Sequence, residues 1–181
     1  MERTERLLDQ LRQYASADAA EAEHRRVMLE LLERADDAFS RAHFAPGHFT
    51  ASAFVLSPDR SALLLVHHRK LDRWLQPGGH VEPDDSDLIA AARREVLEET
   101  GIAALELEHP GSFDLDVHPI PALSGELPHE HFDVRFLFRA GTSELRLSSE
   151  SKAVRWVPLA EVAAAGSDES VLRAVRKLPE S

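Results

Sequence analysis

Apolar positions recur at helical spacing in the first part of the chain and give way to strand-like segments after residue 48. Apolar side chains three and four residues apart predict amphipathic helices over residues 3–14 and from residue 19 to about residue 42. The turn sequence APG at residues 45–47 then marks a boundary. We therefore expect a helical extension over residues 1–45 and a main domain over residues 46–181.

The main domain has the pattern of a mixed α/β unit. The segments TASAFVLS and SALLLVHH flank a Pro-Asp-Arg turn and predict a β-hairpin. Further strands are expected at residues 73–79, within residues 104–118, and at residues 131–139 and 152–159. Helices are expected at residues 87–100, 159–165 and 170–178. This order predicts a mixed sheet that lies between helices.

The helix predicted at residues 87–100 carries three carboxylates: Glu95, Glu98 and Glu99. Their spacing places all three on one side of the helix, so that like charges lie close together. At about 100° per residue, they continue the apolar stripe formed by Leu88, Ala91 and Ala92. Like charges at this spacing repel unless a cation lies among them, and oxygen ligands suit a hard divalent ion such as Mg²⁺. The pattern favours a metal site over a solvated helix face.

The flanks of this helix support the same interpretation. Residues 84–87 supply N-cap candidates and negative charge, and Gly101 suits the position that ends a helix. The preceding turn at residues 77–79 allows the backbone to approach a ligand closely. Arg94 lies next to the carboxylates, where it can orient them and balance charge.

The segment REVLEETGI at residues 94–102, preceded by Gly79, resembles the signature of Nudix hydrolases, G-x(5)-E-x(7)-R-E-U-x-E-E-x-G-U, where U is aliphatic. The distance from Gly79 to Arg94 is one residue longer than in the signature. Counting forward from Gly79 places Asp85 at the position of the first glutamate of the signature. Counting back from Arg94 places Ser86 there. We interpret the difference as a one-residue loop insertion with Asp85 as the equivalent.

The resemblance implies an α/β/α sandwich of the Nudix type and hydrolysis of diphosphate links assisted by Mg²⁺ or Mn²⁺. It implies that the cations are held by glutamates of the signature, with the carbonyl of the first glycine as a further ligand: Glu95, Glu98, Glu99 and Gly79. A general base outside the signature is common in this family, on a loop before a late strand. Glu150 has that place here, and Glu98 is the alternative base, with Arg94 in support.

Several residues outside the triplet are candidates for substrate contact: Arg69, His80, Glu82, Asp85, His129 and His131. The chain has ten histidines, and His129, His131 and Asp133 alternate along one predicted strand. They are compatible with a metal site, a phosphate-binding rim or a solvated strand face. Phosphate contact, with His80 as a partner, is the interpretation we favour.

Composition limits the function. The chain has 181 residues, no cysteine and a formal net charge of −11. No thiol nucleophile or disulfide is available, and the charge disfavours polymeric nucleic acid as a partner. The charged N-terminus lacks the apolar segment of a signal peptide, and no stretch approaches the roughly 20 apolar residues of a membrane span. We therefore expect a cytoplasmic protein with no membrane association, whose N-terminal helices form a docked hairpin or a dimer contact.

Together these features predict hydrolysis of a small nucleoside diphosphate derivative, with ADP-ribose or nucleotide sugars as the favoured type. The alternative is a non-catalytic ligand sensor of the same fold. Such a sensor is expected to have lost its glutamates, whereas this chain keeps them. Diphosphate isomerases of the isoprenoid type share this fold, but they resemble enzymes with a catalytic cysteine. This chain has no cysteine, so that function is disfavoured.

Overall fold

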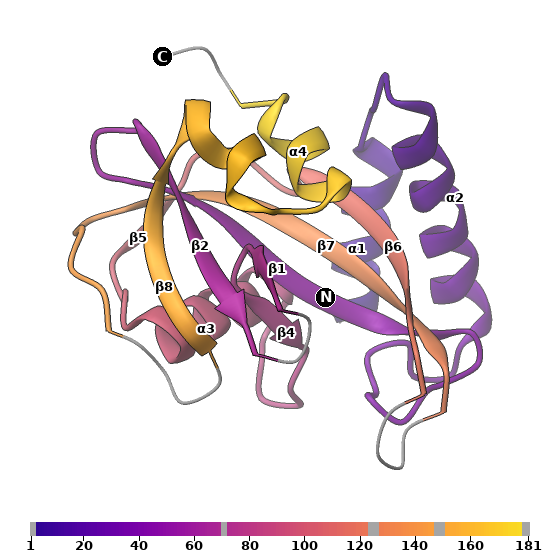
Figure 1. Ribbon diagram of the computed structural model, residues 1–181. Coiled ribbons are helices and arrows are strands. Elements are labelled where there is room, and N and C mark those ends of the chain that lie inside the picture. Colours follow the sequence, from indigo (N-terminus) through magenta and orange to yellow (C-terminus); the bar gives the residue numbers. More distant parts are fainter. Residues whose placement is uncertain (1–2, 70–71, 123–126, 147–150, 179–181) are drawn as a thin grey trace.

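The computed structural model describes residues 3–69, 72–122, 127–146 and 151–178, and Figure 1 shows a curved sheet with helices on both faces. The helical elements, of which η1 is a 3₁₀ helix, are α1 (Arg3–Gln13), α2 (Ala19–Arg34), α3 (Leu88–Thr100), η1 (Leu159–Ala165) and α4 (Glu169–Val175). The strands are β1 (Gly47–Leu56), β2 (Ala62–His68), β3 (Arg73–Leu75), β4 (Gly78–His80), β5 (Leu105–Leu107), β6 (Asp114–Ile120), β7 (His129–Ala140) and β8 (Ser151–Pro158). Within the described ranges, no helix combines the length and apolar character needed to cross a membrane.

The sheet is mixed. Its main path runs β3-β2-β1-β7-β5, with β4 paired to β1, β6 to β7 and β8 to β2. The β1–β7 pair is parallel, whereas the other pairs are antiparallel. The predicted hairpin is present, with Leu56 of β1 opposite Leu63 of β2. The predicted mixed sheet between helices is therefore confirmed.

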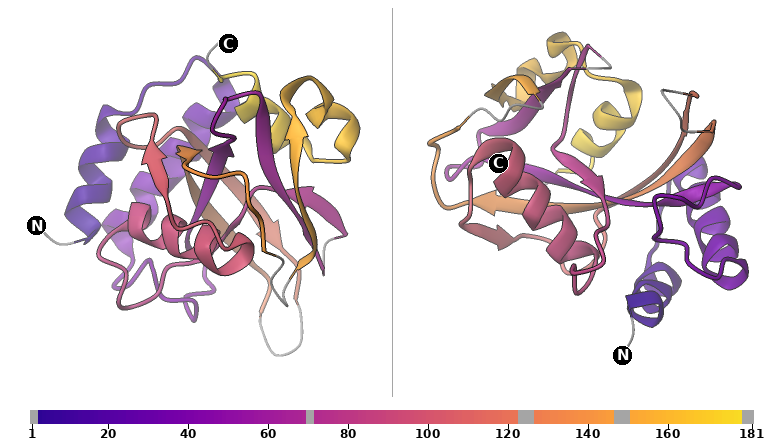
Figure 2. Two further views of the ribbon diagram at one scale, coloured as in Figure 1. Left: turned by 90° about the vertical axis from the view of Figure 1, so that its left-hand side faces the viewer. Right: turned by 90° about the horizontal axis from the view of Figure 1, so that it is seen from below.

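The two faces of β1 have different surroundings because successive side chains of a strand point to opposite sides. Its odd-numbered residues from Phe49 to Val55 pack in one hydrophobic cluster with buried residues of α1, α2 and α3. Phe54 and Leu56 pack with buried residues of η1 and α4. Viewed from below, α3 and the N-terminal helices lie on one side of the sheet, and η1 and α4 lie on the other (Figure 2). The remaining even-numbered positions bring polar side chains to the η1–α4 face: His48, Thr50 and Ser52.

The second N-terminal helix ends at Arg34, so the prediction that it continues to about residue 42 is wrong. Ala35 is already extended, and the carboxylate of Asp37 accepts a hydrogen bond from the backbone N–H of Phe39 at 3.1 Å. Such an aspartate bond favours a turn over a helix. Phe39 is nevertheless buried against Phe49, with ring centroids 5.6 Å apart. The apolar residue that resembled a continued helix reaches the core from a loop.

The N-terminal helices contribute to the core of the whole molecule. Leu7, Leu11 and Met28 are buried in the same cluster as residues of β1, β7 and α3. We propose that residues 1–45 are an extension whose two helices complete the core of the domain formed by residues 46–181.

Glu21 of α2 is fully buried and connects four parts of the chain. Its carboxylate accepts hydrogen bonds from the hydroxyl groups of Tyr14 and Ser16, from Lys177 Nζ at 2.6 Å and from the backbone N–H of Leu115 at 3.0 Å. Burial by itself would raise the pKa of this carboxyl, but the hydrogen bonds outweigh it and lower the pKa from 4.5 to about 2. The ionised form of Glu21 therefore stabilises the folded state.

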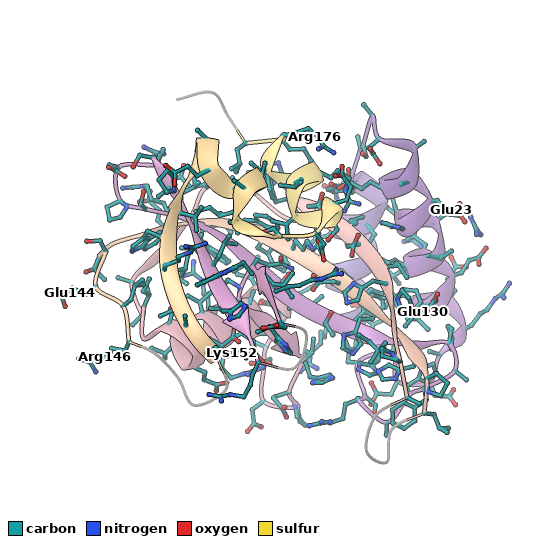
Figure 3. All side chains as sticks on the ribbon, viewed as in Figure 1. Glu23, Glu130, Glu144, Arg146, Lys152 and Arg176 are labelled. Carbon is teal, nitrogen blue, oxygen red and sulfur yellow. The ribbon has the colours of Figure 1, made fainter. Side chains whose placement is uncertain are left out.

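Replacing Glu21 by glutamine is expected to lower the free energy of unfolding at neutral pH by about 3 kcal/mol, because Lys177 loses a buried partner. The folded-state pKa lies below the ordinary value of 4.5, so the contribution is complete above pH 4.5 and disappears as the pH falls toward about 2. Denaturant unfolding of both proteins across this range measures the difference. Glu23→Gln is the control, since Glu23 projects from the outer side of α2 (Figure 3). A difference that does not shrink with acid contradicts the prediction.

Candidate active site

Helix α3 begins and ends where the sequence predicts. The carboxylate of Asp87 accepts a hydrogen bond from the backbone N–H of Ala90 at 2.8 Å, which caps the first turn. Gly101 adopts the left-handed conformation, with φ of 77°, and its N–H bonds to the carbonyl of Leu97. These two caps fix the part of the helix that presents the three glutamates.

The three glutamates of α3 differ in their exposure. Glu99 is buried, and its Oε2 accepts a hydrogen bond from the backbone N–H of Gly78 at 3.1 Å. The side chain of Glu95 is 15% exposed, whereas that of Glu98 is 56% exposed. The expectation that all three continue the buried stripe is therefore right for Glu95 and Glu99 and wrong for Glu98. At about 100° per residue, Glu98 lies about 60° from Glu95 on the side away from Glu99, which places it at the solvent edge.

Strand β4 brings the backbone of Gly79 against Glu95. A Cβ atom at Gly79 would lie 2.5 Å from Glu95 Oε1 and 2.8 Å from Oε2, closer than atoms can approach without displacement. Gly79 is opposite Ala51 of β1 in the sheet, so the strand has no freedom to move away. A side chain at residue 79 would therefore displace the carboxylate of Glu95, which shares this space with the strand backbone.

Arg94 joins the carboxylates to the loop before α3. Its Nη1 donates to Glu95 Oε1 at 2.8 Å and to Glu98 Oε2 at 3.1 Å. Its Nη2 donates to the backbone carbonyl of His80 at 2.8 Å and to Asp85 Oδ2 at 2.9 Å. The hydrogen bond with Asp85 is the main cause that raises the pKa of Arg94 above its ordinary value, with Glu95 contributing. The prediction that Arg94 orients the carboxylates fits this geometry.

Asp85, rather than Ser86, faces Arg94. Its two carboxylate oxygens accept from Arg94, and Oδ2 also accepts from the backbone N–H of Glu82 at 2.8 Å. Burial raises the pKa of Asp85, but the bonds from Arg94 and Glu82 hold it below its ordinary value. Arg3 of α1 donates to the carbonyl oxygens of Glu82 and Asp85 and so ties the loop to the extension. This contact set agrees with a one-residue insertion in which Asp85 replaces the first glutamate of the signature.

Replacing Asp85 by asparagine is expected to lower turnover about 10-fold, because Arg94 loses one of its three charged partners and holds Glu95 and Glu98 less firmly. Asp84→Asn is the matched control, since Asp84 is the exposed neighbour in the same loop. Steady-state kinetics of both variants measure the effect. Equal turnover in the two variants contradicts a positioning role for Asp85.

A cluster of histidines lies on the polar part of the sheet. One ring nitrogen each of His48, His80 and His131 lies within 4.8 Å of the others, and His129 stacks on His48 at 4.9 Å. Burial, together with the neighbouring histidines, lowers the pKa of His131 from 6.5 to about 2, so its ring is neutral. His129 and Asp133 are buried, which rules out a solvated strand face as the explanation of their alternation.

Sequence analysis did not identify His48. It lies directly opposite His131 because β1 and β7 pair in parallel. Of the other predicted residues, Arg69 is exposed just beyond the end of β2, and Glu150 lies outside the described residues. A role for Glu150 as the general base therefore stays a prediction.

The sheet is curved and mixed, and a helix capped at both ends presents glutamates to a strand that contains glycine. These features define the class of protein to which the sequence signature points. The chain belongs to the NUDIX domain family, whose sequence model matches residues 46–177. The resemblance found in the sequence is thus confirmed.

Several known proteins are similar to this chain. It is 33% identical over 99 residues to a probable DHNTP pyrophosphohydrolase of Lactococcus lactis, a match that covers 55% of this chain and 58% of that protein. It is also 33% identical over 99 residues to the asymmetrical bis(5'-nucleosyl)-tetraphosphatase of Mus musculus, covering 55% and 65%. A crystal structure of a NUDIX-family hydrolase from Clostridium perfringens superposes with a TM-score of 0.54 at 24% identity, covering 72% of this chain and 95% of that one.

The sequence matches and the structural match support different conclusions. The chain spans only 58% and 65% of the two curated relatives, so their activities are not carried over as facts. The structural likeness supports the fold, and the Nudix-type α/β/α arrangement is confirmed.

Proposed function

We propose that this chain is a metal-dependent hydrolase that cleaves a pyrophosphate bond in a small nucleoside polyphosphate derivative by water attack at phosphorus. The observation that carries the proposal is that Glu95 lies against Gly79 and Glu99 accepts a hydrogen bond from Gly78, while Arg94 is bonded to Glu95 and Glu98. Family membership agrees with this chemistry.

The donor set fits a hard divalent cation. The guanidinium of Arg94 pairs with three carboxylates, those of Asp85, Glu95 and Glu98, so the site keeps an excess of negative charge. Carboxylate and carbonyl oxygens are the ligands that Mg²⁺ and Mn²⁺ prefer. We propose Glu95, Glu98, Glu99 and the carbonyl of Gly79 as the ligands. When bound, such an ion withdraws charge from the diphosphate oxygens and holds them in place for attack.

Glu98 is the residue we propose to accept the proton of the attacking water. Its side chain is more exposed than that of Glu95, so a water molecule can reach it. The bond from Arg94 fixes its orientation. Glu150, in the segment before β8, is the alternative base.

The substrate class is the finer part of the proposal. The names of the two curated relatives point to dihydroneopterin triphosphate and to dinucleoside tetraphosphates. We therefore place nucleoside and pterin polyphosphates beside the ADP-ribose and nucleotide-sugar type expected from the sequence. Arg69, exposed just beyond the end of β2, is a proposed phosphate contact.

A panel of phosphate compounds tests this function. Diadenosine tetraphosphate, dihydroneopterin triphosphate, ADP-ribose and a nucleotide sugar are each incubated with the chain and Mg²⁺ or Mn²⁺, and products are identified by mass. Cleavage of a P–O–P link that stops on removal of the metal is the expected result. Binding of a compound without cleavage of any supports the alternative, a non-catalytic ligand sensor, and overturns the proposal.

A further inference from the structure

The histidine cluster on the η1–α4 face of the sheet has the features of a second metal site. We propose that His48, His80 and His131 bind a divalent transition-metal ion, Zn²⁺ in particular, at a site distinct from the carboxylates of α3. The three residues come from three paired strands, β1, β4 and β7. The site goes beyond the proposed hydrolysis and does not depend on it.

The positions of the three rings are set by strand register. His48 is opposite His131, and His80 is opposite Thr50, the next residue of β1 on the same face as His48. One nitrogen of each ring lies within 4.8 Å of one nitrogen of the others. Zn–N bonds of about 2.0–2.1 Å place nitrogens of a tetrahedral site about 3.4 Å apart. The nitrogens therefore need to approach one another by at most about 1.4 Å.

Neighbouring groups prepare the rings as ligands. The Nδ1 atom of His48 lies 3.2 Å from the backbone carbonyl of His43, and since a carbonyl only accepts, Nδ1 carries the hydrogen. The lone pair of His48 is therefore on Nε2, an arrangement that typically orients metal-binding histidines. His131 presents a buried Nε2 that has no hydrogen-bond partner within the described residues. A buried acceptor of this kind is costly unless a ligand satisfies it.

The chemistry of the donors separates this site from the carboxylates. Neutral imidazole nitrogen suits Zn²⁺, Cu²⁺, Ni²⁺ and Co²⁺, whereas Mg²⁺ and Mn²⁺ prefer oxygen. The chain has no cysteine that could compete for such an ion. Three nitrogens leave one tetrahedral position for a water molecule or an anionic oxygen.

Strand β4 stands between the two sites. Gly79 lies on the side of the strand that faces Glu95. Gly78, two residues before His80, faces Ser52 on the opposite side. Alternation along the strand places His80 on the Ser52 side, with the other histidines. The bond from Arg94 Nη2 to the carbonyl of His80 joins the sites through the backbone. An ion bound by His80 thus lies on the opposite face of β4 from one bound by Glu95.

Zinc binding in the presence of excess Mg²⁺ tests the site. The full chain is stripped with EDTA, returned to Mg²⁺ buffer and titrated with Zn²⁺ against a chromogenic chelator. We expect one tightly bound equivalent. Substitution by Co²⁺ is expected to give the intense visible bands of a tetrahedral nitrogen site. Failure to compete with the chelator overturns the proposal.

Variants assign the ligands. His131→Gln and His80→Asn are expected to weaken Zn²⁺ binding at least about 100-fold, as loss of one of three protein ligands exceeds the 10- to 100-fold effects of outer partners. His109→Gln, at an exposed histidine, and Glu98→Gln, in the carboxylate site, are the matched controls and are expected to bind as the unaltered chain does. Weak binding in Glu98→Gln combined with unchanged binding in the histidine variants overturns the proposal.

A measurement on the unaltered chain covers the case in which a histidine variant fails to fold. Imidazole resonances in ¹⁵N-labelled protein are followed by NMR during the Zn²⁺ titration. The signals of His48, His80 and His131 are expected to shift together at one equivalent. Shifts confined to other histidines, or to α3 backbone amides, assign the ion elsewhere and overturn the proposal.

Discussion

Replacing Glu98 by glutamine is expected to lower kcat at least about 100-fold, the scale of losing a metal ligand or a general base. The fold is expected to persist because the side chain is 56% exposed and its partner Arg94 keeps Asp85 and Glu95. Glutamine preserves the size of the side chain and removes only its charge and basicity. Steady-state kinetics on the best substrate of the panel, together with thermal unfolding, measure the two expectations separately.

Glu30→Gln is a matched control for this variant. Glu30 also lies on a helix surface four residues after an arginine, Arg26, and is 44% exposed. Both substitutions therefore remove an exposed ion pair of the same spacing, which contributes little to stability. A loss of turnover in Glu98→Gln alone assigns the effect to the site. Full turnover in Glu98→Gln refutes its proposed role and moves the search for the base to Glu150.

Helix α3 could be predicted with its ends because its signals are local. Asp87 and Gly101 lie within one residue of the helix they cap, and the glutamate spacing follows from the helical period alone. The strands were predictable for the same reason, since apolar alternation and turn residues lie within each segment. The exposure of Glu98 is harder to predict from the sequence, because a difference of about 60° around the helix axis separates a buried position from the solvent edge.

Contacts between distant segments could not be predicted from such patterns. The parallel pairing of β1 with β7, which places His48 opposite His131, is a matter of partner and register that no period encodes. Glu21 is a second case, because a charged residue in an amphipathic helix is ordinarily exposed. Its burial depends on Tyr14 and Lys177, which lie outside α2.

Replacing Gly79 by alanine is expected to lower turnover about 100-fold, although no charged or polar group is lost. The new methyl group would lie 2.5 Å from Glu95 Oε1, so the carboxylate must move by the order of 1 Å or more. Displacement on this scale is enough for such a loss when catalytic groups must be held in place. The affinity for Mg²⁺ is expected to fall with turnover, since Glu95 is a proposed ligand.

The control for this variant is Gly141→Ala, which adds the same methyl group where its close neighbour is Ala104 Cβ at 3.0 Å. It reports the general effect of the extra methyl group on stability and is expected to leave turnover and Mg²⁺ affinity unchanged. Comparison of kcat and metal affinity in the two variants separates displacement of Glu95 from simple destabilisation. Normal Mg²⁺ affinity and turnover in Gly79→Ala would mean that Glu95 can move without consequence, and the metal would then have to be held without it.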